Sequence, residues 1–329
     1  MKVGLGSVGL GGWGRTLANA AVAGGSGEIV AGYARSADSR ASFAADFECN
    51  APDSLDDLLD DPAVEGVIVA TAHRSHREIV EAAAAAGKHV FVEKPLTLSI
   101  EDGLACIKAA DAAGVSLQVG HQRRYTTANR RINAMITAGE LGDLEAFETH
   151  QSIPAGFKMP AEAWRWEAGE SPLGAMTSLG VHKIDTMLYH GGPIARVSAL
   201  TRPGRHHPID EVSVLALEFE SGALGTHITS FFVPMTSRIA VYGTEGAAVS
   251  ERDGAVLTIQ ARDEMAPQSV EIEANDPVVD QMVDFCAVAR SEQTPEVDGW
   301  AGLGVVAVLV AAEESAATGR TVDVKNPRD

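Results

Sequence analysis

The chain has 329 residues, of which 45% are hydrophobic and 22% are charged. At roughly 100–200 residues per domain, this length predicts two domains with substantial cores. The balance of apolar and charged residues excludes an intrinsically disordered chain. Lys and Arg number 26 and Asp and Glu number 45, so the formal net charge is −19. Because such a chain repels phosphate backbones and anionic membrane surfaces, we expect neither nucleic acid nor a membrane as a partner.

The cysteines and the apolar segments indicate a cytoplasmic protein. Cys49, Cys106 and Cys286 are widely spaced and form no Cys/His cluster, which favours reduced thiols. Lys2 is followed by a glycine-rich run that Ser7, Trp13 and Arg15 interrupt, so the apolar stretch of a secretory signal is not expected here. The longest apolar run, residues 302–312, is shorter than the roughly 20 residues of a bilayer span, so we expect a buried helix there.

The first part of the chain alternates short apolar runs with amphipathic stretches, which is typical of βαβ units and a parallel sheet. We expect Ser99 to cap the last of these helices and Gly87 and Gly114 to end two of them. The expected strands are residues 2–8, 28–34, 66–71, 89–93 and 115–120, and the expected helices are 15–23, 39–47, 78–86 and 101–113.

The pattern changes after His121. Several alternating segments joined by short turns, one of them Ser221-Gly222, predict an antiparallel sheet. The expected strands are residues 144–150, 194–201, 211–220, 223–232, 238–243, 256–261 and 321–324, with helices at 127–138, 278–290 and 300–318. The fold class is therefore α/β: a doubly wound Rossmann domain over residues 1–122, then an α+β domain over 123–329 with a large, mostly antiparallel, open-faced sheet.

A glycine-rich loop opens the chain and contains two overlapping GxGxxG patterns, Gly4-Gly6-Gly9 and Gly9-Gly11-Gly14. Context favours the second pattern, because a helical run follows Gly14 directly. Glycines at these positions allow a tight turn, close approach to a pyrophosphate and packing of helix on strand. The alternative is a glycine loop without a ligand. The residues expected to bind a cofactor here are Gly9, Gly11, Gly12, Trp13 and Gly14.

The end of the second strand bears on the choice between NAD and NADP. An acidic residue is expected there for the ribose of NAD, but the sequence reads Tyr33-Ala34-Arg35-Ser36. Arg35 and Ser36 offer a cation and a hydroxyl to a 2′-phosphate, which favours NADP over NAD. Asp38 is close enough to restore recognition of NAD if the loop is shifted.

A lysine lies at the carboxyl end of a predicted strand, in Val92-Glu93-Lys94-Pro95. Ligands of open α/β sheets bind at this edge, where a lysine can donate to a substrate oxygen. The alternative is a structural lysine paired with Glu93.

Several motifs together resemble the glucose–fructose oxidoreductase / inositol dehydrogenase / rhizopine-catabolism (Gfo/Idh/MocA) family. The resemblance covers essentially the whole chain and implies two domains and a nicotinamide cofactor. The motifs are the loop of residues 9–14, Ala70-Thr71 with His76, Gly87-Lys88-His89-Val90, Glu93-Lys94-Pro95, Gly120-His121-Gln122-Arg123-Arg124-Tyr125, Gly180-Val181-His182-Lys183-Ile184-Asp185 and Ser315-Ala316-Ala317-Thr318-Gly319-Arg320.

The resemblance implies that Lys94 and His182 are the catalytic residues. His182 would be the general base for a substrate hydroxyl, and Lys94 would donate a polarising hydrogen bond. Many members have an aspartate four residues before the histidine, where this chain has Ser178. Asp185, one helical turn after His182, would orient the imidazole or a substrate hydroxyl, or else be a carboxylate on the helix surface.

The remaining candidates surround these residues. His76 either caps a helix or approaches the nicotinamide, and the tryptophans of Trp164-Arg165-Trp166 either face a sugar ring or anchor the packing. One of Arg123 and Arg124 would hold the domain junction. The further cofactor-binding residues are Thr71, His76, Glu93 and Lys94, and the substrate-binding residues are Arg123, Tyr125, Trp164, Arg165, Trp166, Ser178 and His182. His206-His207 with Asp210 lack the spacing of a zinc site, so no metal is expected.

The sequence therefore predicts an NAD(P)-dependent oxidoreductase. Its reaction would transfer a hydride between nicotinamide and a carbinol or carbonyl carbon of a sugar, cyclitol or related small polyhydroxy compound. Two alternatives stay open: a redox-assisted lyase or glycosidase that retains NAD, and a non-enzymatic NAD(P)-binding regulatory protein. Nothing in the sequence separates a hexose from an inositol. The open-faced sheet predicts a homodimer or homotetramer.

Overall fold

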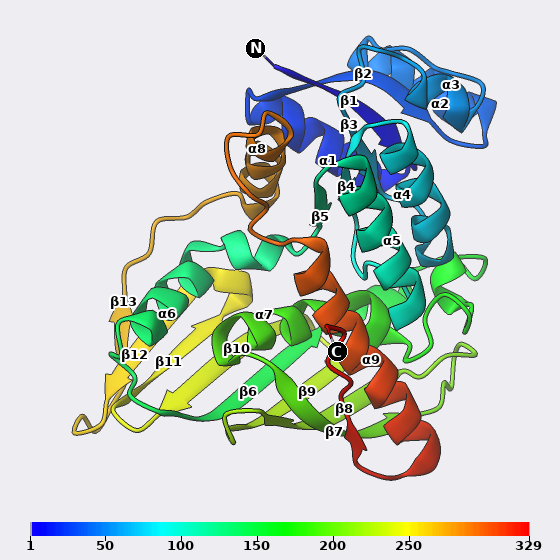
Figure 1. Ribbon diagram of the computed structural model, residues 1–329. Helices are drawn as coiled ribbons and strands as arrows, with labels where there is room; N and C mark the ends of the chain where they lie inside the picture. The colour runs from blue at the N-terminus through cyan, green and yellow to red at the C-terminus, as the bar shows by residue number, and fades with distance from the viewer. Residues whose placement is uncertain (1, 329) are drawn as a thin grey trace. The chain divides into compact units, whose positions relative to one another are not determined.

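The computed structural model describes residues 2–328, which divide into two compact units. The first unit runs up to Gln122 and includes Asp276–Leu303, and the second consists of Arg123–Asn275 and the residues from Gly304 onward. Figure 1 shows the parallel strands of the first unit and the broad sheet of the second.

A five-stranded parallel sheet forms the centre of the first unit, with the strand order β2-β1-β3-β4-β5. Its strands are β1 (Val3–Val8), β2 (Gly27–Tyr33), β3 (Gly66–Val69), β4 (His89–Val92) and β5 (Leu117–Val119). The chain leaves β1 toward β2 and later returns to β3 on the other side. The carboxyl ends of β1 and β3 therefore form a topological switch point, where ligands of such sheets bind. The predicted Rossmann fold is confirmed.

The helices of the first unit are α1 (Gly12–Ala23), α2 (Ala37–Phe47), α3 (Leu55–Leu59), α4 (His76–Ala85), α5 (Ile100–Ala113) and α8 (Pro277–Ala289). Right-handed crossovers to opposite sides of the sheet put α1 and α4 on opposite faces. The Ser99 hydroxyl accepts a hydrogen bond from the Asp102 amide and begins α5, and Gly114, with a φ of 68°, ends it. Both caps are as predicted, whereas the sequence pattern did not indicate α3.

The segment from Asp276 to Leu303 belongs to the first unit, although the sequence predicted it to lie in a second domain of residues 123–329. Its helix α8 buries Met282 and Phe285 in one core with α1 and β1. The Val119 amide of β5 donates to the Val297 carbonyl at 2.9 Å, so the segment also continues the edge of the sheet. The sequence of a C-terminal helix shows which of its faces is apolar, but it does not show which of the two sheets that face covers.

The second unit is built on a nine-stranded sheet with the order β13-β12-β11-β10-β6-β9-β8-β7-β14. Neighbouring strands are antiparallel except β6 and β9, which are parallel. The strands are β6 (Leu144–Ser152), β7 (Ile194–Arg202), β8 (Val212–Phe219), β9 (Leu224–Ser230), β10 (Thr236–Gly243), β11 (Gly246–Glu251), β12 (Val256–Ala261), β13 (Gln268–Val270) and β14 (Val322–Asp323). The mostly antiparallel sheet confirms the prediction, and β11 and β13 are additions to it.

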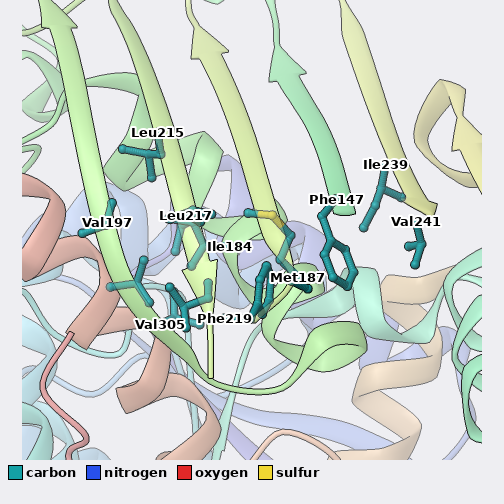
Figure 2. Packing of buried hydrophobic residues seen from close by; sticks show 14 of the residues in the cluster. Phe147, Ile184, Met187, Val197, Leu215, Leu217, Phe219, Ile239, Val241 and Val305 are labelled. Carbon is teal, nitrogen blue, oxygen red and sulfur yellow. The ribbon is translucent and has the colours of Figure 1, made fainter. Parts of the chain in front are cut away.

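Helices cover one face of this sheet: α6 (Thr127–Thr137), α7 (Val181–Gly191) and most of α9 (Gly299–Thr318). Figure 2 shows the core between them, where Phe147 and Phe219 from the sheet meet Ile184 and Met187 of α7. The centroids of the two phenylalanine rings are 4.6 Å apart. Alternation along the strands puts other apolar side chains on the opposite face: Leu200 is 76% exposed, Leu224 59% and Ile228 39%.

Helix α9 is long and apolar enough to cross a membrane by length and composition alone. Its apolar side chains are nevertheless largely buried inside the protein, and Val305 and Val308 belong to the core of the second unit. Burial in a protein core accounts for this composition, as the sequence predicted for residues 302–312.

Candidate active site

The loop between β1 and α1 requires glycine at two positions. Gly9 has a φ of +93°, and its amide donates to the Tyr33 carbonyl at 3.1 Å. A Cβ atom on Gly9 would lie 2.5 Å from the Ala70 carbonyl oxygen, and one on Gly14 would lie 2.0 Å from the Gly9 carbonyl oxygen. Both distances are far below van der Waals contact. Gly9 therefore makes the tight turn and Gly14 lets α1 pack on it, the roles expected for the first and third glycines.

The middle of the same loop is open. A Cβ atom on Gly11 or Gly12 would meet no protein atom within 4 Å. Gly11 caps α1 without a side-chain hydrogen bond, so the first amides of the helix have no capping partner from that residue. A helix N-terminus favours anions, and an open glycine cradle admits a bulky one. These residues fit the pyrophosphate of a dinucleotide, and Trp13, 37% exposed, lies in the first turn.

The residues predicted to choose between NAD and NADP lie on the loop from β2 to α2 and in the first turn of α2. Arg35, Ser36 and Asp38 are all exposed. The Ser36 hydroxyl accepts a hydrogen bond from the Ser39 amide at 3.3 Å and so caps α2. Arg35 is the cation that this loop presents to solvent.

Arg40 holds this loop, and the sequence interpretation missed it. Its guanidinium donates to the carbonyl oxygens of Ala34 at 3.0 Å and Arg35 at 3.3 Å, and to the Asp53 carboxylate at 2.7 Å. The Arg40 guanidinium therefore fixes the backbone on both sides of the Ala34–Arg35 peptide bond. The sequence signal for this role is the position of Arg40, four residues after Ser36, the N-cap of α2.

Glu93 and Lys94 follow the buried strand β4. The buried Glu93 carboxylate accepts a hydrogen bond from the Lys94 amide at 3.3 Å. A Cβ atom on Gly120 would lie 2.7 Å from Glu93 Oε1, so glycine at the end of β5 makes room for this carboxylate. The Lys94 side chain is half-buried and lies at the carboxyl edge of the sheet, where ligands bind.

His76 connects the ends of β3 and β4. Its Nδ1 is 3.0 Å from the Pro95 carbonyl oxygen and 3.2 Å from that of Leu96, and its Nε2 is 3.4 Å from the Thr71 carbonyl oxygen. The ring is wholly buried, and desolvation lowers its pKa. A neutral imidazole thus anchors the backbone just after Lys94. The Thr71 hydroxyl accepts from the Ser75 hydroxyl at 2.8 Å. Cofactor binding by Thr71 and His76 stays a prediction.

In the second unit, one turn of π-helix, Met176–Gly180, runs into α7. Ser178 on this turn lies 3.2 Å from the Ser171 hydroxyl, and the two share a hydrogen bond. His182 lies in the first turn of α7 and is 6% exposed. Its carbonyl accepts from the Thr186 hydroxyl at 2.8 Å, which is a local bond within the helix.

Asp185, predicted to assist His182, forms a buried ion pair with Arg124. Arg124 donates from Nε at 3.0 Å and from a terminal nitrogen at 2.6 Å to the same carboxylate oxygen. The Tyr189 ring lies 5.1 Å from the guanidinium carbon. His190 is nearby, and burial, with Arg124 next in importance, lowers its pKa to about 3. This pair accounts for the burial of Asp185, and an orienting role toward His182 stays a prediction.

Tyr125 is also buried within the second unit, whereas the Arg123 side chain is 12% exposed. Arg123 forms an ion pair with Asp253, and burial lowers the pKa of its guanidinium to about 10. The Tyr125 side chain is 1% exposed, and its carbonyl accepts from Asn275 Nδ2 at 2.7 Å. Both arginines that follow the first unit therefore have carboxylate partners in the second.

The tryptophans of residues 164–166 differ in environment. Trp166 is 3% exposed, donates from Nε1 to the Pro160 carbonyl at 2.8 Å and stacks on His207 with centroids 3.7 Å apart. It is a packing anchor, which was one of the two predicted roles. Trp164 and Arg165 are half-buried, and the guanidinium carbon of Arg165 lies 4.3 Å from the Trp164 ring centroid. Across residues 2–328, no group of three or more His, Cys, Asp or Glu side chains could hold a metal ion.

Comparison with known proteins identifies both parts of the chain. Residues 3–121 match the model of the GFO/IDH/MocA oxidoreductase family with an NAD-binding Rossmann fold, and residues 129–249 match the GFO/IDH/MocA C-terminal domain.

Two relatives and one solved structure illustrate the similarity. The chain is 27% identical over 312 residues to a 1,5-anhydro-D-fructose reductase of Ensifer adhaerens, covering 91% of this chain and 92% of that protein. It is 32% identical over 204 residues to a scyllo-inositol 2-dehydrogenase (NAD(+)) of Bacillus subtilis strain 168, covering 58% and 56%. A crystal structure from Desulfitobacterium hafniense DCB-2, provisionally designated an NADPH-dependent oxidoreductase, superimposes with a TM-score of 0.93 at 28% identity over 98% of both chains.

Substitutions at two glycines separate binding from folding in the first loop. Gly11→Ala should leave stability unchanged, because its methyl group meets no protein atom, yet weaken dinucleotide binding by about tenfold or more, equivalent to about 1.4 kcal/mol. Gly14→Ala should lower the free energy of unfolding by about 1–3 kcal/mol, because its methyl group overlaps the Gly9 carbonyl. Denaturant melts and cofactor titrations measure both. Equal binding by Gly11→Ala and wild type would refute the pyrophosphate assignment.

Removal of one partner from the ion pair of Arg124 and Asp185 should destabilise the protein strongly. Asp185→Ala leaves a buried guanidinium unpaired, which should cost about 3–5 kcal/mol in the free energy of unfolding. Glu218→Ala breaks the half-exposed pair with Arg196 and should cost less than about 1 kcal/mol. Denaturant unfolding measures both. A fully stable Asp185→Ala protein that has lost activity would instead assign Asp185 to catalysis.

Proposed function

The chain belongs to the GFO/IDH/MocA oxidoreductase family, and from this premise we propose that it is an NAD(P)-dependent dehydrogenase or reductase of a sugar, cyclitol or related polyhydroxy compound. The observation that carries the proposal is the open glycine cradle at the switch point of the parallel sheet. Lys94 follows β4 at the same edge. The two relatives named above act on an anhydrofructose and an inositol, which supports the substrate class.

Residues 9–14 hold the dinucleotide, which supplies the hydride acceptor or donor when bound. Lys94 donates a hydrogen bond to the reacting oxygen of the substrate and stabilises the negative charge that develops there. The His76 imidazole holds the Pro95 and Leu96 carbonyls and so supports the backbone next to Lys94.

His182 takes the hydroxyl proton during oxidation and returns it during reduction. Ser178, in place of a carboxylate, binds a substrate hydroxyl without taking its proton. Net production of NAD(P)H distinguishes this reaction from a lyase or glycosidase that retains its cofactor, and from a regulatory protein without turnover.

NADP is the preferred cofactor in this proposal. Arg35 and Ser36 stand where an acidic ribose ligand would favour NAD, and Arg40 holds the backbone of this loop through the Ala34 and Arg35 carbonyls. A guanidinium gives charge-assisted hydrogen bonds to a phosphate, which a ribose hydroxyl cannot match.

The protein is proposed to assemble as a homodimer or homotetramer through the open face of its nine-stranded sheet and to work in the cytoplasm. Leu200, Leu224 and Ile228 are exposed on this face, and a second copy would remove them from water. Free Cys49, Cys106 and Cys286 fit a reducing compartment.

Catalysis tests the roles of Lys94 and His182. Lys94→Ala should lower kcat by orders of magnitude, because the hydrogen bond it removes acts on the transition state. His182→Ala should lower kcat/KM about 10²–10⁴-fold, the usual effect of losing a general base. NAD(P)H absorbance measures the rates, and cofactor titration serves as the control for binding. A Lys94→Ala rate within a few-fold of wild type would reject its role, as would an unchanged pH profile for His182→Ala.

Cofactor choice tests Arg35. The wild type should bind NADP roughly ten- to hundred-fold more tightly than NAD, because one charge-assisted bond contributes about 1.5–3 kcal/mol. Arg35→Ala should remove most of this preference and leave the Kd for NAD unchanged. Asp38→Asn, in the first turn of α2 three residues after Arg35, is the matched control and should change neither Kd. Calorimetric titration of both cofactors measures these constants. Tighter binding of NAD by the wild type would show that the Asp38 carboxylate binds the ribose hydroxyls instead.

A further inference from the structure

The covered face of the nine-stranded sheet has an apolar half and a polar half. Along β6 the inward side chains run from Phe147 through Thr149 to Gln151, and along β10 they run from Val241 and Ile239 to Ser237. The buried polar side chains at this end are Thr149, Gln151, His227, Thr229 and Ser237, each at most 7% exposed. A layer that served packing alone would be apolar throughout.

Lys183 lies in this layer, on the first turn of α7, and is 3% exposed. Its charge contributes to the lowered pKa values of His227 and His190, which are about 3, although burial is the larger cause for both. The start of α7 lies directly on β9, because a Cβ atom on Gly180 would be 2.8 Å from His227 Nε2. Lys183 is therefore close to the polar half of the sheet.

Within residues 2–328, the Lys183 ammonium makes no hydrogen bond or ion pair. Burial is the main cause that lowers the pKa of Lys183, and repulsion from the Arg123 cation adds to it. The neighbouring arginines are balanced, since Arg123 pairs with Asp253 and Arg124 with Asp185. Lys183 is thus a buried amine with no carboxylate to balance it when protonated.

Such a residue is costly for the fold, because a buried amine either gives up its proton or keeps a charge that has lost its hydration and has no partner. An unbranched apolar residue such as Met would fill the same space more stably. Positions that sacrifice stability in this way are typical of functional sites. The group that Lys183 lacks is an anion.

His227 adds a hydrogen-bond acceptor next to this amine. The Thr149 hydroxyl donates to the Thr226 carbonyl at 3.0 Å, so its oxygen accepts the Nδ1 hydrogen of the neutral His227 ring at 2.9 Å. This assigns the lone pair to Nε2, which has no hydrogen-bond partner in the described part of the chain. An amine and an acceptor side by side suit a ligand that carries both an anionic group and hydroxyl groups.

We propose that Lys183 binds a carboxylate of the substrate, so that the protein acts on sugar acids in preference to neutral sugars. This inference rests on the proposed oxidoreductase function and names its substrate class. A carboxylate carries one negative charge, which matches the one unbalanced amine, whereas a phosphate carries more. The Asp253 carboxylate that pairs with Arg123 is held in turn by the polar layer, because the Ser237 hydroxyl lies 3.1 Å from both Gln151 Oε1 and Asp253 Oδ1.

Ligand binding to the wild type with bound NADPH gives the first test. The acids are D-gluconate, D-glucuronate and D-galacturonate, and their neutral counterparts are D-sorbitol, D-glucose and D-galactose, all at equal ionic strength. At least one acid should raise the Tm and bind at least tenfold more tightly than its neutral counterpart, because binding to the folded state raises stability. D-glucose 6-phosphate is included to separate carboxylate from phosphate recognition.

Variants of Lys183 give the second test. Lys183→Met should remove the preference for the acid, so that the Kd of the acid rises tenfold or more. The Kd of NADPH should stay unchanged. The Tm of the unliganded protein should stay the same or increase. Lys183→Arg, which keeps the cation, should retain part of the preference. Lys325→Met changes an exposed lysine of the same unit and should have no effect.

Each other result contradicts the inference. No acid-specific shift in the wild type would refute it, whether both ligand classes bind equally or neither binds. Tighter binding of D-glucose 6-phosphate that depends on Lys183 would replace the carboxylate with a phosphate. A Lys183→Met protein that unfolds would make Lys183 a structural residue. Failure to bind NADPH or NADH would refute the proposed function itself, which is a separate outcome.

Discussion

The contact between Gly14 and the Gly9 carbonyl determines the rest of the first unit. With a side chain at either position, α1 would move away from the ends of β1 and β3, and its first amides would no longer face the switch point. Because both glycines are in place, the open positions at Gly11 and Gly12 come to lie where the parallel sheet concentrates its ligand-binding loops. Arg35 and Lys94 follow strands of the same sheet and reach the same edge.

The second unit balances its buried charges in a different way. Arg123 and Arg124 each have a carboxylate partner, so their burial is compensated within the protein. Lys183 has none, and His182 lies one residue before it on α7. Burial keeps His190 and His227 neutral in this layer and also lowers the pKa of Lys183, so the proposed carboxylate would favour the protonated form of this amine. Lys183 therefore lowers the stability of the protein, whereas the proposed recognition of a carboxylate requires it.

The sequence predicted the elements of the first unit and the register of its glycine loop, because strand–glycine–helix order is a local signal. It did not indicate β11, whose Gly-Ala-Ala run lacks the β-branched residues typical of strands, nor the attachment of α8 to the first unit. The pairing of Asp185 with Arg124 depends on residues 61 positions apart, which one sequence does not reveal. The burial of Lys183 could not be predicted either, because a lysine in a helix is usually solvent-exposed.

Hydrogen exchange with and without saturating NADPH tests the central claim, that the loop of residues 9–14 holds the pyrophosphate of a dinucleotide. The account predicts that amide exchange slows in a peptide containing Gly11 and the first turn of α1, and also in the peptide containing Arg35. Unchanged exchange in the loop while NADPH binds would show that the dinucleotide lies elsewhere and would contradict the account.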